Sequence, residues 1–385
     1  MQNFIFHNPT RYIFGEGQIQ LLSQEISKIG KKVFLVYGSG SIKKNGVYEQ
    51  VLAQLTGFEV KEFSGVEPNP RLETLAKALP LIREFAPDII LAVGGGSVID
   101  GAKFLAVAAY FDGEDLWEIV KTHGEAVTGK VIPLGVVLTM SATASEFNGG
   151  SVITRWATHE KDYFETEETR PRFSLVDPQA QYSLPEEQII YGIIDPFSHV
   201  LEQYITQTTD FEVQDRLAEA LLLSLIDQGP KVLRNKQDYS ARANLAFAAS
   251  LALNNLIGSG VTQDWATHSL EHVVSGFYDI PHAAGLAIIT PHWMQVVGLT
   301  QKFEKMVRYG RNVWGLTGTD EVVAAGAITK TSEFFSSLGA KMTLTAWNIP
   351  HESLEQLVSA AVKYGNIGEN ALSEVQIRDI YTRCY

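Results

Sequence analysis

Histidines are concentrated in one part of this 385-residue chain: four of the nine lie within residues 264–292. His268 and His272 are four residues apart, so a helix would project both imidazoles from one face. His282 follows after an expected turn. Neutral imidazole is the commonest side-chain ligand for zinc, iron and related ions. The stretch therefore predicts half of a metal site.

Asp195 and His199 show the same four-residue spacing and are candidates for the other half. Pro196 predicts either a helix start capped by Asp195 or a local kink, and in both cases the carboxylate and the imidazole share a face. For this pair alone, a helix cap beside a buried histidine is the simpler interpretation. A carboxylate with histidines suits Fe²⁺ or Zn²⁺, and the lack of cysteine ligands argues against a closed structural zinc site.

A glycine-rich turn at residues 94–97 follows the apolar stretch 88–93 and precedes a helix that carries Asp100 in its first turn. Backbone N–H groups in such a turn can face a diphosphate, because glycines permit close approach. The sequence is neither a Walker loop nor a Gly-x-Gly-x-x-Gly motif. The alternative is a tight strand-to-helix turn without a ligand.

Two further strand ends carry small or hydroxyl side chains. Residues 38–41, Gly-Ser-Gly-Ser, follow the apolar run 33–37, where an adenosine ribose is expected. This turn has no acidic residue to hold a ribose 2′-hydroxyl, and Lys43 and Lys44 follow it, so NADP(H) is preferred over NAD(H). For the lysines, a solvated basic helix start is the alternative. The hydroxyl-rich segment 139–146 suits phosphate or ribose.

These segments need a scaffold, and the chain up to residue 176 alternates strand and helix signals. That rhythm predicts a parallel sheet with helices on both faces, which binds ligands at the carboxyl ends of its strands. Short strands are expected at 4–6 and 11–14, and a hairpin or exposed loop within 149–176. From about residue 185 the strand signals stop. Helical spacing or helix-forming composition then marks residues 185–188, 211–226, 240–256, 267–276, 303–314, 320–338 and 351–364, with a final helix after Ser373.

The length predicts about two domains, and 45% hydrophobic with 19% charged residues suits a soluble enzyme. The net charge of −13 disfavours nucleic acid and anionic membrane surfaces as partners. Cys384 is the lone cysteine, so it forms neither an intrachain disulfide nor a Cys-based zinc site. With no signal segment recognised, the expected location is the cytoplasm.

The chain resembles the iron-containing (group III) alcohol dehydrogenases over essentially its whole length. It looks closest to the branch of NADPH-dependent aldehyde reductases and butanol dehydrogenases, to which residues 41–46 and 263–268 are similar. One departure is Ala283, where the family usually has glycine after the third metal histidine. Six motifs in the family's order carry the resemblance: Glu67-Pro-Asn-Pro70, Gly94-Gly-Gly-Ser-Val-Ile-Asp100, Thr139 to Glu146, Asp195-x-x-x-His199, His268-x-x-x-His272 and Pro281-His282.

The resemblance implies a Rossmann-like nucleotide-binding α/β domain over residues 1–184 and an all-α metal-binding domain over 185–385, the dehydroquinate synthase-like fold, with the metal and nicotinamide in the cleft between them. It implies four metal ligands, Asp195, His199, His268 and His282. His272 is implied to lie near the nicotinamide and the substrate. The implied cofactor residues are Gly38, Ser39, Gly40 and Ser41 at the adenosine ribose, Gly95, Gly96, Ser97 and Asp100 at the diphosphate, Thr139, Thr143 and Ser145 in the hydroxyl segment, Asn69, and Lys161.

The implied reaction is reversible hydride transfer between NADP(H) and an aldehyde or primary alcohol such as butyraldehyde or butanol. Fe²⁺ or Zn²⁺ would act as the Lewis acid, with His272 as proton relay. The family also implies a homodimer. The rivals are an NAD-dependent polyol dehydrogenase of the glycerol or propanediol type, a metal-dependent hydrolase, and a metal- or nucleotide-binding regulatory protein.

Overall fold

The computed structural model describes residues 2–385, which form two compact units. The α/β unit comprises His7–Pro185 and Lys236–Ala246. The helical unit comprises the described residues through Phe6 together with Glu186–Asn235 and Phe247–Tyr385. Across residues 2–385, no helix has the length and apolar character needed to cross a membrane. The functional boundary after residue 184 stays a prediction.

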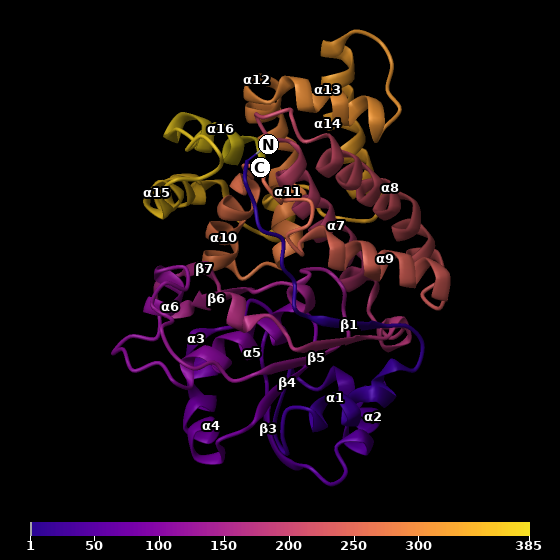
Figure 1. Cartoon of the computed structure of the whole chain (residues 1–385). Coiled ribbons are helices and arrows are strands. Elements are labelled where there is room, and N and C mark those ends of the chain that lie inside the picture. Colours follow the sequence, from indigo (N-terminus) through magenta and orange to yellow (C-terminus); the bar gives the residue numbers. More distant parts are fainter. Residues whose placement is uncertain (1) are drawn as a thin grey trace. The chain divides into compact units, whose positions relative to one another are not determined.

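A six-stranded parallel sheet forms the centre of the α/β unit, in the order β1-β8-β5-β4-β2-β3, and confirms the predicted architecture (Figure 1). Most of its strands are apolar runs, as expected where both faces are covered. Its strands are β1 (Arg11–Phe14), β2 (Lys32–Tyr37), β3 (Glu59–Ser64), β4 (Ile89–Gly94), β5 (Leu134–Leu138) and β8 (Phe173–Val176).

Helices cover both faces of this sheet. Leu35 and Leu91 pack with α1 (Leu22–Ser27) and α2 (Val47–Gln54) on one face. The side chains that alternate with these along β2 and β4, such as Phe34 and Ile90, point to the opposite face of the sheet. The helices on that face are α3 (Leu72–Leu75), α4 (Leu79–Phe85), α5 (Gly96–Ala108) and α6 (Glu118–Lys121). The chain leaves β2 for β3 on one side and returns as β4 on the other, so a topological switch point lies between β2 and β4.

Two strand predictions in this part had different outcomes. The stretch 149–176 contains an antiparallel hairpin of β6 (Gly150–Arg155) and β7 (Glu160–Glu165), followed by β8, which confirms the hairpin. Residues 4–6 do not form a strand, so that prediction was wrong. Their apolar side chains are exposed, with Ile5 at 95% of its full accessible area, and they pair with no neighbouring strand. A short apolar run alone is insufficient without a ladder partner.

The helical unit is built from helices, as predicted, but the helical spacing did not indicate every one of them, and one of the helices it missed carries a predicted metal ligand. That helix is α11 (His282–Trp293), whose side chains are buried on nearly every side, so it lacks the polar face that a helical pattern requires. The other helices are α7 (Glu186–Tyr204), α8 (Glu212–Arg234), α9 (Tyr239–Ala252, shared with the α/β unit), α10 (Ala266–Tyr278), α12 (Leu299–Gln301), α13 (Phe303–Asn312), α14 (Asp320–Ser337), α15 (Leu354–Tyr364) and α16 (Glu374–Arg383).

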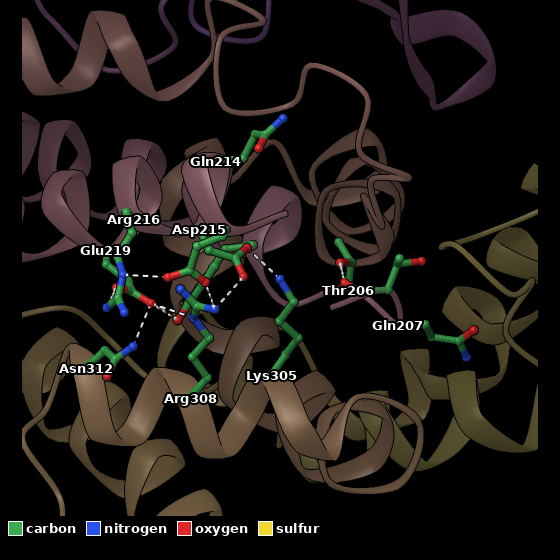
Figure 2. Close-up of polar contacts among 12 residues, drawn as sticks. Thr206, Gln207, Gln214, Asp215, Arg216, Glu219, Lys305, Arg308 and Asn312 are labelled. Atoms are coloured by element: carbon green, nitrogen blue, oxygen red, sulfur yellow. Dashed lines mark hydrogen bonds and ion pairs between the residues drawn. The ribbon is translucent and has the colours of Figure 1, made fainter. Parts of the chain in front are cut away.

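Buried charges in this unit are paired across helices rather than left isolated. Figure 2 shows α8 joined to α13, with Lys305 Nζ donating to Asp215 Oδ1 at 2.5 Å and Arg308 Nε donating to Glu219 Oε1 at 2.8 Å. Asn312 also donates to Glu219 at 2.8 Å. A buried carboxylate is costly unless its oxygens are compensated in this way.

Candidate metal and cofactor sites

Asp195 and His199 lie one turn apart in the middle of α7, and both are buried. Pro196 lies inside this helix, which begins at Glu186. The interpretation of Asp195 as a helix cap was therefore wrong. Proline has no N–H, so it forfeits one helical hydrogen bond, and packing of a largely apolar helix outweighs that local loss.

The other histidines come from α10 and α11. His268 lies in the first turn of α10, after Trp265, whose φ of 61° places it in the left-handed region. His272 follows one turn later, and His282 is the first residue of α11, after the turn that the sequence predicted. The i, i+4 spacing places His268 and His272 on one helical face.

Three imidazoles converge on one carboxylate oxygen. Asp195 Oδ1 lies 3.4 Å from Nε2 of His199, 3.9 Å from that of His268 and 3.8 Å from that of His282. Donor atoms of Asp195, His268 and His282 all lie within 4.8 Å of one another. Bonds of about 2.0–2.2 Å to one ion place its ligands about 3 to 3.5 Å apart, close to this spacing.

The chemistry of these donors fits a divalent cation. His268 Nε2 is buried and has no hydrogen-bond partner among residues 2–385, although it faces the cluster. Such an atom costs about 1–3 kcal/mol when left unsatisfied, which metal coordination would offset. Burial, and then the neighbouring His268 and His282, hold the pKa of His199 well below its usual value, so its imidazole is neutral as a ligand must be.

Two carboxylates that were not predicted from the sequence contact the Nδ1 atoms of two ligand histidines, on the opposite edge of each ring from Nε2. Glu202 makes a short contact with Nδ1 of His268, and Glu271 makes one with Nδ1 of His282. Burial opposes protonation of His268, but the Glu202, Asp195 and Glu271 carboxylates outweigh it and raise the pKa of that imidazole. Spacing could have revealed both, since each glutamate lies three residues after a ligand histidine on the same helix.

His272 lies beside the cluster. Its ring centroid is 5.5 Å from that of His282, and its Nδ1 lies 3.3 Å from the hydroxyl of Tyr364. Donor atoms of His272, His282 and Glu271 are also within 4.8 Å of one another. This residue is therefore close enough to exchange a proton near the same site, directly or through one water.

In the α/β unit, the predicted cofactor segments lie at the carboxyl ends of three adjacent strands. Residues 38–41 follow β2, residues 95–97 follow β4 and open α5, and Thr139 follows β5. Thr139 N donates to Gly94 O at 2.9 Å, which joins two of these ends. Parallel strands end at one edge, so the topology brings these segments together.

Packing requires glycine at the β4 turn. A Cβ at Gly96 would lie 2.4 Å from Thr143 Cγ2 and 2.5 Å from its Oγ1. A Cβ at Gly95 would lie 3.1 Å from Met140 Cβ. Gly95 precedes α5 without any side-chain cap, so the first N–H groups of a 13-residue helix are available to an anion.

The remaining predicted cofactor residues are partly engaged with one another. Ser145 Oγ donates to Asp100 Oδ1 at 2.5 Å, and Val152 N donates to Asp100 Oδ2 at 3.1 Å. Lys161 Nζ donates to Asn69 Oδ1 at 3.0 Å, which joins the hairpin to the Pro-Asn-Pro loop. Of the turn at 38–41, Ser39 and Ser41 are exposed.

Lys103 is a buried residue of this unit that the sequence analysis missed, although it lies on α5 three residues after Asp100. Its Nζ donates to Asn148 Oδ1 at 3.0 Å and to Gly150 O at 2.6 Å, so it ties α5 to β6. Burial lowers the pKa of Lys103 to about 8 and raises that of Asp100, while their mutual attraction opposes both shifts.

Both parts of the chain match one protein family. Residues 9–178 match "Iron-containing alcohol dehydrogenase", and residues 189–385 match "Fe-containing alcohol dehydrogenase family, C-terminal". The sequence is 44% identical over 368 residues to the probable NADH-dependent butanol dehydrogenase 2 of Bacillus subtilis (strain 168), covering 94% of this chain and 93% of that protein. It is 43% identical to the NADPH-dependent aldehyde reductase YqhD of Escherichia coli (strain K12), covering 96% of each.

Solved structures agree with this assignment. E. coli K-12 YqhD is similar with a TM-score of 0.97 at 41% identity, covering 100% of this chain and 99% of that one. NADH-dependent butanol dehydrogenase A from Thermotoga maritima has a TM-score of 0.95 at 36% identity, again covering 100% and 99%. The chain therefore belongs to the iron-containing alcohol dehydrogenase family, which implies a divalent metal and a nicotinamide cofactor, and it is an oxidoreductase of the alcohol dehydrogenase and aldehyde reductase class.

Proposed function

We propose that this enzyme interconverts aldehydes and primary alcohols, such as butyraldehyde and butanol, with NADP(H) and a divalent metal, Fe²⁺ or Zn²⁺. The ligands proposed are Asp195, His199, His268 and His282. The observation that carries the proposal is the convergence of three Nε2 atoms on Asp195 Oδ1, at 3.4–3.9 Å. One carboxylate and three imidazoles suit both ions.

When bound, the metal supplies Lewis acidity that polarises the carbonyl oxygen of the substrate. The protein's contribution is orientation, because the donors lie on three packed helices and three of them, Asp195, His199 and His268, are buried. Trp265 packs edge-on to His199 and His268, with ring centroids 6.1 and 5.2 Å away, and this indole shields the imidazoles from water.

For the cofactor, we propose that the N-terminus of α5 with Gly95, Gly96 and Ser97 binds the diphosphate. Thr139 and Thr143 then lie toward the nicotinamide ribose, and residues 38–41 toward the adenosine ribose. Asp100 and Ser145 stabilise the N-terminal part of α5 through their mutual hydrogen bond. The hydrogen bond from Lys161 to Asn69 fixes the β6–β7 hairpin to the Pro-Asn-Pro loop, and we propose that both residues lie near the cofactor.

The preference for NADP(H) over NAD(H) is supported by the neighbourhood of the β2 turn. Glu62 on β3 is a carboxylate of this neighbourhood, and the hydroxyls of Tyr37 and Tyr48 donate to its two oxygens at 2.8 and 2.9 Å. Lys43 Nζ lies over both rings, 5.0 and 4.5 Å from their centroids. A carboxylate engaged in this way is a poor partner for a ribose 2′-hydroxyl, whereas the ammonium favours a 2′-phosphate.

A cofactor and aldehyde panel tests the whole proposal. Butyraldehyde should be reduced with a kcat/KM at least about tenfold higher with NADPH than with NADH, a difference of about 1.4 kcal/mol. Prolonged chelation should abolish the rate, and Fe²⁺ or Zn²⁺ should restore it. Full activity in metal-free protein would remove the metal from the reaction. A preference for NADH with glycerol or 1,2-propanediol would favour the polyol dehydrogenase, and hydrolysis without nucleotide would favour a hydrolase.

His272 is proposed to relay the proton that the nascent alkoxide must gain. His272→Ala is expected to lower kcat for reduction by about tenfold and to flatten its pH profile, because water can replace the imidazole only in part. The measurement is kcat between pH 5.5 and 9, with the exposed His351→Ala as the matched control. An unchanged rate and profile in His272→Ala would show that it carries no proton.

We further propose that the enzyme acts in the cytoplasm as a homodimer, without nucleic acid or membrane partners. The net charge of −13 supports the absence of polyanionic partners. The dimer rests on the family resemblance. Sedimentation velocity tests it, since the chain mass is 42.5 kDa and a purely monomeric species would contradict it.

A further inference from the structure

The metal-site histidines differ in the contacts of their Nδ1 atoms, which face away from the proposed metal. Glu202 contacts Nδ1 of His268 and Glu271 contacts Nδ1 of His282, and both carboxylates are buried, with 1% and 0% of their residue surface exposed. His199 Nδ1, by contrast, has no hydrogen-bond partner among residues 2–385. Burying two carboxylates is costly, so their placement against two of the three rings calls for a role.

Glu202 ties the ligand helix α10 to the ligand helix α7. It lies on α7 one turn after His199, and its second oxygen accepts the backbone N–H of Thr267 at 2.5 Å. Its own carbonyl accepts the N–H of Asp264 at 3.0 Å. Asp264 in turn pairs with the buried ammonium of Lys302 at 2.7 Å. Both carboxylate oxygens of Glu202 are therefore in contact with α10, which holds Thr267 and His268 in its first turn, and the carbonyl of Glu202 holds Asp264 just before the helix.

Glu271 makes the corresponding connection between α10 and α11. It lies three residues after His268 on α10 and reaches the ring of His282 at the start of α11. Gly285 gives this side chain its room, because a Cβ there would lie 2.6 Å from Glu271 Cγ and 3.0 Å from its Oε1. The glycine lies within a helix, so its reason is steric rather than conformational.

We infer that Glu202 and Glu271 are positioning residues that hold the Nδ1–H tautomer of His268 and His282, so that both Nε2 lone pairs are directed to the metal beside Asp195. This inference rests on the proposed metal function. A neutral imidazole carries one N–H, and a carboxylate accepting it at Nδ1 leaves Nε2 as the donor to metal and increases its basicity.

Charge and tautomer can be separated by substitution. Glu202→Gln would leave one acceptor oxygen for two donors, the Thr267 N–H and the His268 Nδ1–H, so this variant should release the imidazole toward its other tautomer. Glu271→Gln removes the charge behind His282. Gly285→Ala leaves every charge in place and displaces the Glu271 side chain, so it should resemble Glu271→Gln.

The experiment measures Co²⁺ and Zn²⁺ affinity of the metal-free proteins by competition with a chromophoric chelator, together with the visible Co²⁺ absorption spectrum. The matched control is Glu219→Gln, a buried glutamate of the same unit that accepts from Tyr204, Arg308 and Asn312 (Figure 2). We expect about 10- to 100-fold weaker binding and a changed spectrum for Glu202→Gln, Glu271→Gln and Gly285→Ala, with wild-type values for Glu219→Gln.

The possible failures are distinguishable. The proposed function itself would be overturned if the wild-type protein bound no metal, or if the Asp195→Asn variant bound metal as tightly as the wild type. Wild-type binding with unchanged affinity and spectrum in Glu202→Gln and Glu271→Gln would overturn only the positioning roles. The positioning roles would also be overturned if the loss of metal affinity in every variant, Glu219→Gln included, paralleled the loss of thermal stability of the metal-free protein. If Glu202→Gln does not fold, Glu271→Gln and Gly285→Ala decide by the same criteria.

Discussion

Asp195→Asn is expected to lower kcat/KM for aldehyde reduction by about 1000-fold or more and to leave the purified protein with little bound metal. Asparagine keeps the shape of the side chain but removes the anionic oxygen on which the three Nε2 atoms converge. Metal polarisation of a carbonyl contributes several kcal/mol to the transition state, and each 1.4 kcal/mol is a factor of about ten in rate. Steady-state kinetics and elemental analysis of the same preparation measure both effects.

Asp215→Asn is the matched control, because Asp215 is also a buried aspartate of the helical unit, and its partners are Lys305 and Arg308. It should lose stability but keep its metal and most of its kcat once folded. Asp195→Asn with wild-type metal content and rate would contradict the proposed ligand set. Equal losses in both variants would mean that general destabilisation, rather than coordination, explains the result.

Gly96→Ala is expected to weaken NADPH binding by up to about 100-fold while metal binding stays at the wild-type level. The new methyl group would lie 2.4–2.5 Å from the Thr143 side chain at the start of α5. Overpacking of this kind costs about 1–3 kcal/mol, and relieving it must shift either Thr143 or the helix N-terminus. Both are proposed to contact the cofactor, so strain and binding are coupled.

Fluorescence titration with NADPH measures this affinity, and Gly101→Ala on the same helix is the control. Its Cβ would lie 3.0 Å from Leu75 Cδ2, the end of a flexible side chain, and alanine is the better helix former by about 1 kcal/mol. That variant should bind NADPH normally. Unchanged NADPH affinity in Gly96→Ala would argue that the diphosphate binds elsewhere.

Local patterns in the sequence were sufficient for the scaffold of the α/β unit. Apolar runs such as 33–37 and 88–93, each ended by a glycine turn, predict buried parallel strands, and the structure confirms them in β2 and β4. Strands of this kind are buried on both faces, so a continuous apolar run marks them, although their hydrogen bonds go to other strands such as β3 and β4 around β2. Residues 4–6 show the limit, because a strand also needs a partner that no local pattern supplies.

Helix α11 and Pro196 show a second limit. A helix buried on nearly every side has no polar stripe, so α11 could not be recognised by periodicity although His282 at its start was. Pro196 is locally a helix breaker, yet it lies inside α7. Tertiary packing decided both, since the apolar area that these helices bury outweighs the local preference, which is about 3 kcal/mol for a proline inside a helix.

By itself, the sequence determined which residue types and spacings could bind a metal and a dinucleotide, because i, i+4 pairs and strand-end glycines are properties of single elements. Only the tertiary structure decided that Asp195, His199, His268 and His282 converge, and that Glu202 and Glu271 lie behind two of the rings. These contacts join α7, α10 and α11, and Glu202 and His268 are 66 residues apart in the chain. Their geometry depends on how apolar helix faces pack, which the order of residues within one helix does not specify.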